Sequence, residues 1–195
     1  MNAEDRKKQI LDAAYKAFAR EGYHGTTMDK IAARIGVTKG TLYLYFKDKA
    51  DLFTSVLEDR ILKLESSITE ALRKTQDPEE KLIAVLREFG RYGRRERHFF
   101  SMLYRSAPLP AKVRKLIEDR VSPIRDRIEL EVSSIMEEGI RLGKFKPLQP
   151  RMMAVAFLGM THGFLRNPPR VSVLVQTISE IFFDGVKIHK GREET

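Results

Sequence analysis

Two helical patterns lie on either side of one glycine, Gly36, and this arrangement constrains the fold more than any other part of the sequence. In residues 28–35, apolar side chains recur at i, i+3, i+4 and i+7, the spacing of one side of an α-helix. Thr27 can cap the start of that helix, and Gly36 tolerates the left-handed conformation that ends many helices. A second short helix is predicted over about residues 38–45, with Thr38 as its cap. Two short helices joined by a tight glycine turn form a helix-turn-helix unit.

The second helix has an apolar side and a polar side. Leu42 and Phe46 are expected to pack onto the first helix, together with Val37, so Lys39 and Tyr43 are expected to face solvent. The other residues that border the outward side are Thr38, Gly40 and Thr41. Such a surface suits double-stranded DNA, because the N-terminal turn of a recognition helix enters the major groove and approaches base edges and phosphates.

The string GVTKGTLYLYFKDKADLF (residues 36–53), preceded by TTMDKIAARI, resembles the DNA-binding signature of the TetR/AcrR family of bacterial transcriptional repressors. The resemblance is dense over the N-terminal quarter, and beyond Leu57 it extends only to length and helical layout. It implies an all-α fold of about nine helices. A three-helix, homeodomain-like head would occupy residues 1–48, and an antiparallel helical bundle for effector binding and dimerisation would occupy residues 49–195.

Eight residues are predicted to bind DNA. They are Thr27, Thr38, Lys39, Gly40, Thr41, Tyr43, Tyr45 and Lys49. Lys49 resembles the phosphate-contacting lysine of the family, and the alternative for it is an ordinary exposed lysine.

Helical periodicity continues through the rest of the chain. Further helices are predicted over residues 5–21, 49 to about 75, 78 to about 96, 98–105, 111–143, 150 to about 166, and 171 to about 190. Asp77 is expected to cap the helix that begins at Pro78, and Pro123 is a point where the helix over residues 111–143 can kink. The last two are apolar around much of their circumference and need cover on more than one side. They are therefore predicted to form the homodimer interface, as the family resemblance also implies.

Bulky and flexible residues expected to face the middle of the C-terminal bundle are candidates for an effector pocket. Methionine and aromatic side chains adapt to apolar guests, although each residue could instead be ordinary core. The candidates are Phe89, Phe100, Leu103, Tyr104, Met136, Phe157, Met160 and His162. The pocket itself is implied by the resemblance, and its apolar composition suggests a fatty-acid, acyl-CoA, aromatic or drug-like effector.

Composition argues against several classes of function. The formal net charge of +9 favours a polyanionic partner, although charge alone is a weak signal. The absence of cysteine excludes disulfides, thiolate catalysis and cysteine-bound zinc, and the four histidines are too widely separated for a metal site. The sequence has no Gly-rich phosphate loop and no Gly-x-Ser-x-Gly elbow, so we expect no catalytic residue, no metal and no cofactor. Without a signal peptide or an apolar run of membrane length, a cytoplasmic protein is expected.

The favoured hypothesis is a ligand-responsive repressor. In it, a homodimer places two recognition helices ~35 Å apart on a roughly palindromic DNA operator, and a small apolar effector selects a form that no longer fits. Two alternatives stay open: a ligand-independent architectural DNA-binding protein, and a helical lipid- or drug-binding protein whose helix-turn-helix is vestigial.

Overall fold

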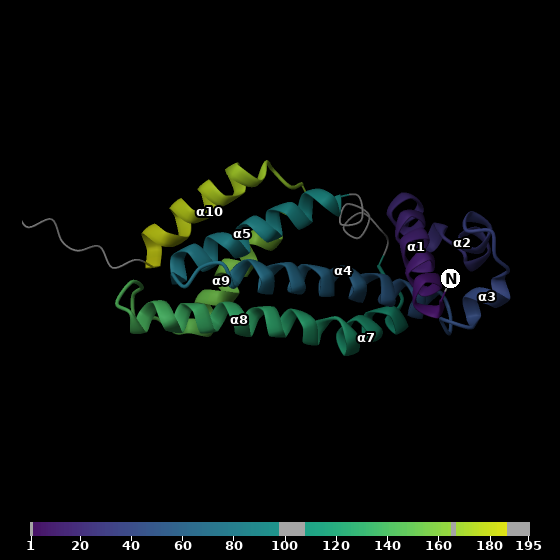
Figure 1. Ribbon diagram of the computed structural model, residues 1–195, viewed down its shortest axis with the longest axis horizontal. Helices are drawn as coiled ribbons and strands as arrows, with labels where there is room; N and C mark the ends of the chain where they lie inside the picture. Colours follow the sequence, from purple (N-terminus) through teal and green to yellow (C-terminus); the bar gives the residue numbers. More distant parts are fainter. Residues whose placement is uncertain (1, 98–107, 165–166, 187–195) are drawn as a thin grey trace, which may run out of the picture. The chain divides into compact units, whose positions relative to one another are not determined.

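The computed structural model describes residues 2–97, 108–164 and 167–186, and these residues form nine α-helices (Figure 1). The helices are α1 (Ala3–Gly25), α2 (Met28–Arg34), α3 (Lys39–Tyr43), α4 (Lys49–Leu72), α5 (Pro78–Arg95), α7 (Ala111–Arg120), α8 (Ser122–Arg141), α9 (Pro150–Gly163) and α10 (Val171–Val186). The predicted all-α class is confirmed. Within the described ranges, no helix has the length and apolar character needed to cross a membrane.

The chain divides into two compact units, each built from separate stretches of sequence. The first contains residues 1–63 and 96–125, and the second contains residues 64–95 and 126–195. Helix α4 therefore contributes to both units. The boundary predicted after residue 48 is a division by function, and it stays a prediction.

The first unit is held together by one apolar core. Phe18 of α1 is fully buried and meets Phe53 of α4 edge to face, with ring centroids 4.9 Å apart. Leu42 of α3 and Val113 of α7 are also fully buried in the same cluster. Burying such side chains is the main source of stability in a small helical unit. The core that supports the helix-turn-helix thus includes α7, about 70 residues further along the chain.

In the second unit, α5 packs against both α10 and α9. The close approach of α10 depends on Gly90 of α5, because a Cβ atom there would lie 3.0 Å from Leu174 Cδ2 and 3.2 Å from Val171 Cγ1. Between α9 and α10, Phe157 and Phe182 meet edge to face at 5.0 Å. The interior of this unit is accordingly filled by aromatic and branched aliphatic side chains at close range.

The prediction of one continuous helix over residues 111–143 is wrong, because the chain forms α7 and α8 with a break at Val121, although this break lies close to Pro123, where a kink is predicted. Pro123 has no N–H to donate to the carbonyl four residues earlier, so the hydrogen-bond ladder is interrupted there. The Asp77 cap is confirmed, since its Oδ1 accepts the N–H groups of Glu79 at 2.9 Å and Glu80 at 3.2 Å. The helix predicted over residues 98–105 lies outside the described residues.

Candidate nucleic-acid interface

The turn between α2 and α3 has the local geometry that the sequence predicts. Thr27 Oγ1 accepts the N–H of Lys30 at 3.3 Å, and Thr38 Oγ1 accepts the N–H of Thr41 at 3.2 Å. Gly36 has φ of +67°, a left-handed conformation that glycine adopts without steric cost. Both caps and the glycine turn are therefore confirmed.

Helix α3 has one buried side and one exposed side. Leu42 is 0% exposed and Phe46, just beyond the helix, is 2% exposed, whereas Tyr43 is 47% exposed. The side chain of Lys39 is likewise 48% exposed. The predicted inward and outward faces are confirmed, and the exposed face carries a cation and a phenol hydroxyl.

Lys39 forms an ion pair that the sequence analysis missed. Its Nζ donates to Asp29 Oδ2 of α2 at 2.9 Å, and this hydrogen bond raises the pKa of Lys39. Both side chains are about half exposed or more, so water and salt screen the attraction. A pair of this kind contributes little to stability.

Lys49 lies in a more enclosed place than an ordinary surface lysine. Its Nζ donates to the carbonyl oxygens of Tyr23 at 3.0 Å and Thr26 at 3.1 Å, and it stands 4.4 Å from the centroid of the Tyr23 ring. Burial lowers the pKa of Lys49. The ammonium group thus ties the start of α4 to the end of α1 with two of its three donors, and its contact with DNA stays a prediction.

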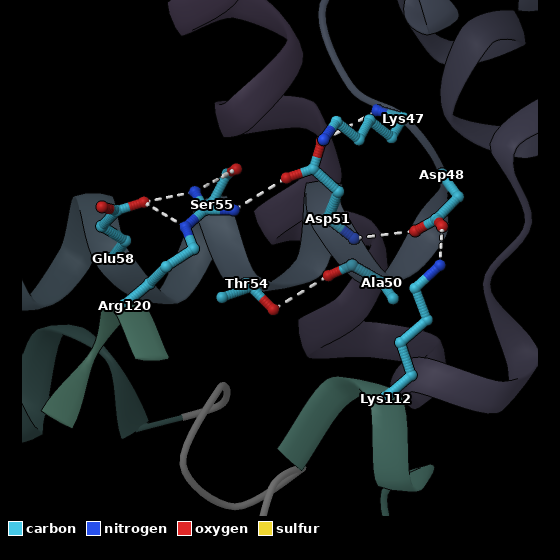
Figure 2. Close-up of polar contacts among 9 residues, drawn as sticks. All are labelled: Lys47, Asp48, Ala50, Asp51, Thr54, Ser55, Glu58, Lys112 and Arg120. Carbon is cyan, nitrogen blue, oxygen red and sulfur yellow. Dashed lines mark hydrogen bonds and ion pairs between the residues drawn. The ribbon is translucent and has the colours of Figure 1, made fainter. Parts of the chain in front are cut away.

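A polar network fixes the junction between α3 and α4 (Figure 2). Asp48 Oδ1 accepts the N–H of Asp51 at 2.9 Å, and Asp51 Oδ2 accepts the N–H of Lys47 at 2.8 Å. The Asp48 side chain therefore caps the start of α4, and the Asp51 side chain holds the backbone of the residue before that cap. Burial alone would raise the pKa of Asp48, but hydrogen bonds from Lys112 and from backbone N–H groups lower it.

Helix α7 supplies two cations to this junction. Lys112 pairs with Asp48, while Arg120 reaches Asp51 Oδ1 at 2.7 Å and Ser55 Oγ at 2.9 Å and also pairs with Glu58. These contacts join residues more than 60 positions apart, so no local sequence pattern could have found them. The junction that positions α3 is held from α7 as well as from α4.

The exposure of the remaining predicted DNA-binding residues varies. Thr27, Thr38 and Gly40 are exposed, whereas Thr41 and Tyr45 are half-buried. The structure also presents an exposed residue that the sequence analysis did not single out: Leu44 is 82% exposed, and it directly follows Tyr43.

The residues predicted for an effector pocket do not all gather in the interior. Phe89, Met136 and Phe157 are buried, and Met160 is half-buried. The expectation that His162 faces the middle of the bundle is wrong, because its side chain is exposed, although its ring meets the ring of Phe89 edge to face at 5.6 Å between centroids. The neighbouring Thr161 takes the buried position instead, and its hydroxyl donates to the Leu158 carbonyl at 2.7 Å. Phe100, Leu103 and Tyr104 lie outside the described residues.

A small cavity lies beside α5 in the second unit. Its volume is about 10 Å³, and its lining includes Phe89, Gly93, Thr161 and Leu174. That volume is at the lower limit for a single water molecule. An effector at this place would therefore have to move side chains or helices apart.

Two family models match the sequence. Residues 10–56 match "Bacterial regulatory proteins, tetR family", and residues 75–166 match "Tetracyclin repressor-like, C-terminal domain". Among related proteins, the HTH-type transcriptional regulator YhgD of Bacillus subtilis is 28% identical over 154 residues, which are 79% of this chain and 79% of YhgD.

Solved structures share the fold. The fatty acid degradation regulator FadR from Bacillus halodurans gives a TM-score of 0.79 at 23% identity, with 92% of this chain and 95% of FadR covered. The transcriptional regulator FadR from Bacillus subtilis, in complex with stearoyl-CoA, gives a TM-score of 0.76 at 26% identity, with 93% and 99% covered. The matched segments include the helix-turn-helix and most of the helices after it. This chain therefore belongs to the TetR family of transcriptional regulators, which bind operator DNA and are not enzymes.

Proposed function

We propose that this protein is a repressor that leaves its operator when a small apolar effector binds. The observation that carries the proposal is the exposed side of α3, where Lys39 and Tyr43 stand outward over the buried Leu42 and Phe46. In a repressor of this kind, that side of α3 enters the major groove. The protein would act in the bacterial cytoplasm, with residues 1–48 as the DNA-binding part and residues 49–195 as the regulatory part.

The predicted DNA-binding residues would contact different parts of the DNA, according to the chemistry of their side chains. Lys39 would exchange Asp29 for a phosphate, and the exposed hydroxyls of Thr27 and Thr38 would hydrogen-bond other phosphate oxygens. Tyr43 has both an apolar ring and a hydroxyl to offer a base edge, and Gly40 leaves space for the DNA backbone to come close. Thr41, Tyr45 and Lys49 are proposed as further contacts.

Dimerisation is proposed through α9 and α10. Each helix carries large apolar side chains that are at least 44% exposed in the single chain. Contact with a second copy would remove these side chains from water, which is favourable. They are Met152 and Val155 of α9 and Val173 and Ile181 of α10. A twofold dimer through these helices would form a four-helix bundle and would match a palindromic operator.

For the effector we propose an acyl-CoA thioester. The similarity to the Bacillus subtilis FadR that was solved with stearoyl-CoA supports this class. The buried Phe89, Met136 and Phe157 provide an apolar interior in which an acyl chain could replace protein contacts. If the acyl chain binds beside α5, where the cavity has only about 10 Å³, the second unit would have to open there, and such an opening could shift the dimer away from its DNA-binding form.

The test begins with selection of a DNA site from random sequences by the purified full-length protein. Fluorescence anisotropy then measures the affinity of the selected site for the wild type, Lys39→Ala and Tyr43→Ala, with Lys74→Ala, an exposed lysine in the turn after α4, as the matched control. We expect both head variants to lose at least tenfold in affinity and the control to bind as the wild type does. Failure to select any sequence would argue for an architectural protein, and no DNA binding at all would argue for a vestigial head.

The effector is tested on the same complex. Stearoyl-CoA, a shorter acyl-CoA and free coenzyme A are titrated into the protein–DNA complex. Release by the thioesters and not by free coenzyme A is the expected result. An unchanged complex at every concentration would remove acyl-CoA from the proposal without affecting the DNA-binding part.

A further inference from the structure

The residues that point most directly away from the core on α3 are Gly40 and Leu44. Leu42 is fully buried and marks the inward direction. At about 100° per residue, Gly40 and Leu44 each lie roughly 160° from Leu42 around the helix axis, whereas Tyr43 lies only about 100° from it. The exposed fractions agree with this order, because Leu44 is 82% exposed and Tyr43 is 47% exposed.

The backbone at Leu44 is well fixed, although the helix ends there. Its φ of −69° and ψ of −25° are helical, and its N–H donates to the Gly40 carbonyl at 3.3 Å. Two residues further on, the buried Phe46 donates its N–H to the Leu42 carbonyl at 3.0 Å. The outward direction of the Leu44 side chain is therefore imposed by a buried residue on each side.

The surface beside Leu44 is open. Side chains on a helix lean toward its N-terminus, so the isobutyl group of Leu44 lies over the turn that contains Gly40. A Cβ atom at Gly40 would have only Thr38 Oγ1 as a neighbour, at 3.6 Å. The exposure of Leu44 and the missing side chain at Gly40 together leave this part of the surface open to an approaching group.

The chemistry of Leu44 restricts what it could recognise on DNA. An isobutyl group neither donates nor accepts hydrogen bonds, so it gains nothing from a phosphate or from a polar base edge. Among the four base pairs, the bulkiest apolar group in the major groove is the C5-methyl of thymine. With five residues α3 is only about 7.5 Å long, less than the groove width of roughly 12 Å, so both of its ends can reach base edges.

We propose that Leu44 reads one thymine in each operator half-site through the C5-methyl group of the base. The inference rests on the proposed entry of α3 into the major groove. It assigns to the exposed leucine a specificity role next to Tyr43, and it requires no contact beyond the apolar one.

Deoxyuridine provides the test, because it differs from thymidine only by the missing methyl group. Each thymidine of the selected site is replaced in turn by deoxyuridine, symmetrically in both half-sites, and affinity is measured for wild type and Leu44→Ala. For the wild type we expect one sensitive position, with a loss of about fourfold per half-site, as for one methyl-sized group withdrawn from an apolar contact. In Leu44→Ala the same substitution should cost little, because the partner of the methyl group has been removed.

Leu130→Ala is the matched control, since Leu130 is an exposed leucine of α8, and its profile should be that of the wild type. Truncating Leu44 leaves no buried cavity, so a folding defect is not expected, and circular dichroism checks this. The inference is overturned if no thymidine is sensitive, if the selected half-site contains no thymine, or if the deoxyuridine penalty persists in Leu44→Ala. In each of these cases, loss of binding by Lys39→Ala would still leave the proposed function standing.

Discussion

The exposed side of α3 and the interior of the second unit differ in where the residues proposed for function lie, although helical periodicity separates buried from exposed residues in both. The buried Leu42 of α3 and Phe46, just beyond the helix, hold α3 on the core, and the residues proposed for function point into solvent. In the second unit, Phe89, Met136 and Phe157 are both the core and the proposed ligand site. The exposed side of α3 would thus need little rearrangement to meet DNA, whereas an effector bound beside α5, where the cavity is about 10 Å³, would have to open the core.

The strongest test of this contrast removes an anchor of α3. Phe46→Ala deletes a side chain that is 2% exposed, so we expect a loss of about 3–5 kcal/mol in the free energy of unfolding, together with loss of DNA binding. Tyr43→Ala is the companion, because Tyr43 is 47% exposed, and its unfolding free energy should change by about 0.5 kcal/mol or less while DNA binding is lost. Urea unfolding and anisotropy measure the two quantities. Equal destabilisation by the two variants would show that α3 is not divided into anchor and ligand-facing sides.

The features of the α2–α3 turn that the sequence predicted correctly depend only on residues close together in the chain. A cap such as Thr38 and a turn glycine such as Gly36 act within four residues, so their roles follow from type and spacing alone. The placement of His162 failed because the periodicity of α9 offers adjacent candidates for the buried side, and packing against other helices selects Thr161. The contact of Arg120 with Asp51 joins residues that are 69 positions apart, so no local pattern in the sequence indicates it.

The second prediction concerns the packed interior. Gly90→Val adds a Cβ atom where Leu174 Cδ2 is 3.0 Å away, so overpacking should cost about 1–3 kcal/mol of unfolding free energy. Gly25→Val is the control, because a Cβ atom there meets only Glu21 Cβ, at an ordinary 3.5 Å. If the effector site opens beside α5, Gly90→Val should also raise the stearoyl-CoA concentration needed for release, with DNA affinity unchanged. A stable variant with normal release would place the site elsewhere.

The third prediction tests how far the exposed surface depends on the network at the α3–α4 junction. Asp48→Asn keeps an oxygen for the α4 cap but removes the charge that pairs with Lys112. The pKa of Asp48 is lowered in the folded protein, so its ionised form stabilises the fold above about pH 4, and this stabilisation is lost as the pH falls through the folded-state pKa. We expect Asp48→Asn to be less stable by about 0.5 kcal/mol at pH 7. The difference should shrink as the pH falls below about 4, and urea unfolding at several pH values measures it, with Asp119→Asn, an exposed residue of α7, as control.

The smallest expected effect is a gain in DNA affinity, and it tests whether the exposed side of α3 can bind DNA without first breaking a contact within the protein. In the proposed complex, Asp29 would compete with DNA for the ammonium group of Lys39, and its own negative charge would repel the approaching phosphates. Asp29→Asn should therefore tighten DNA binding about two- to threefold at low salt, with a smaller gain at high salt, because both side chains are exposed and screened. Asp126→Asn, an exposed aspartate in the second unit, controls for the change in net charge.

A double-mutant cycle then assigns the cause of that gain. If Asp29 acts by holding Lys39, the benefit of Asp29→Asn should largely vanish in a Lys39→Ala background. If the benefit persists there undiminished, Asp29 acts only by repelling phosphates, and the pair is not an internal competitor for DNA. The first result would mean that the exposed surface of α3 also has to break a contact, the Lys39–Asp29 ion pair, before it binds DNA. The two regions would then differ only in how many contacts must break before a ligand binds: one exposed ion pair at α3, and the packing of a core in the second unit.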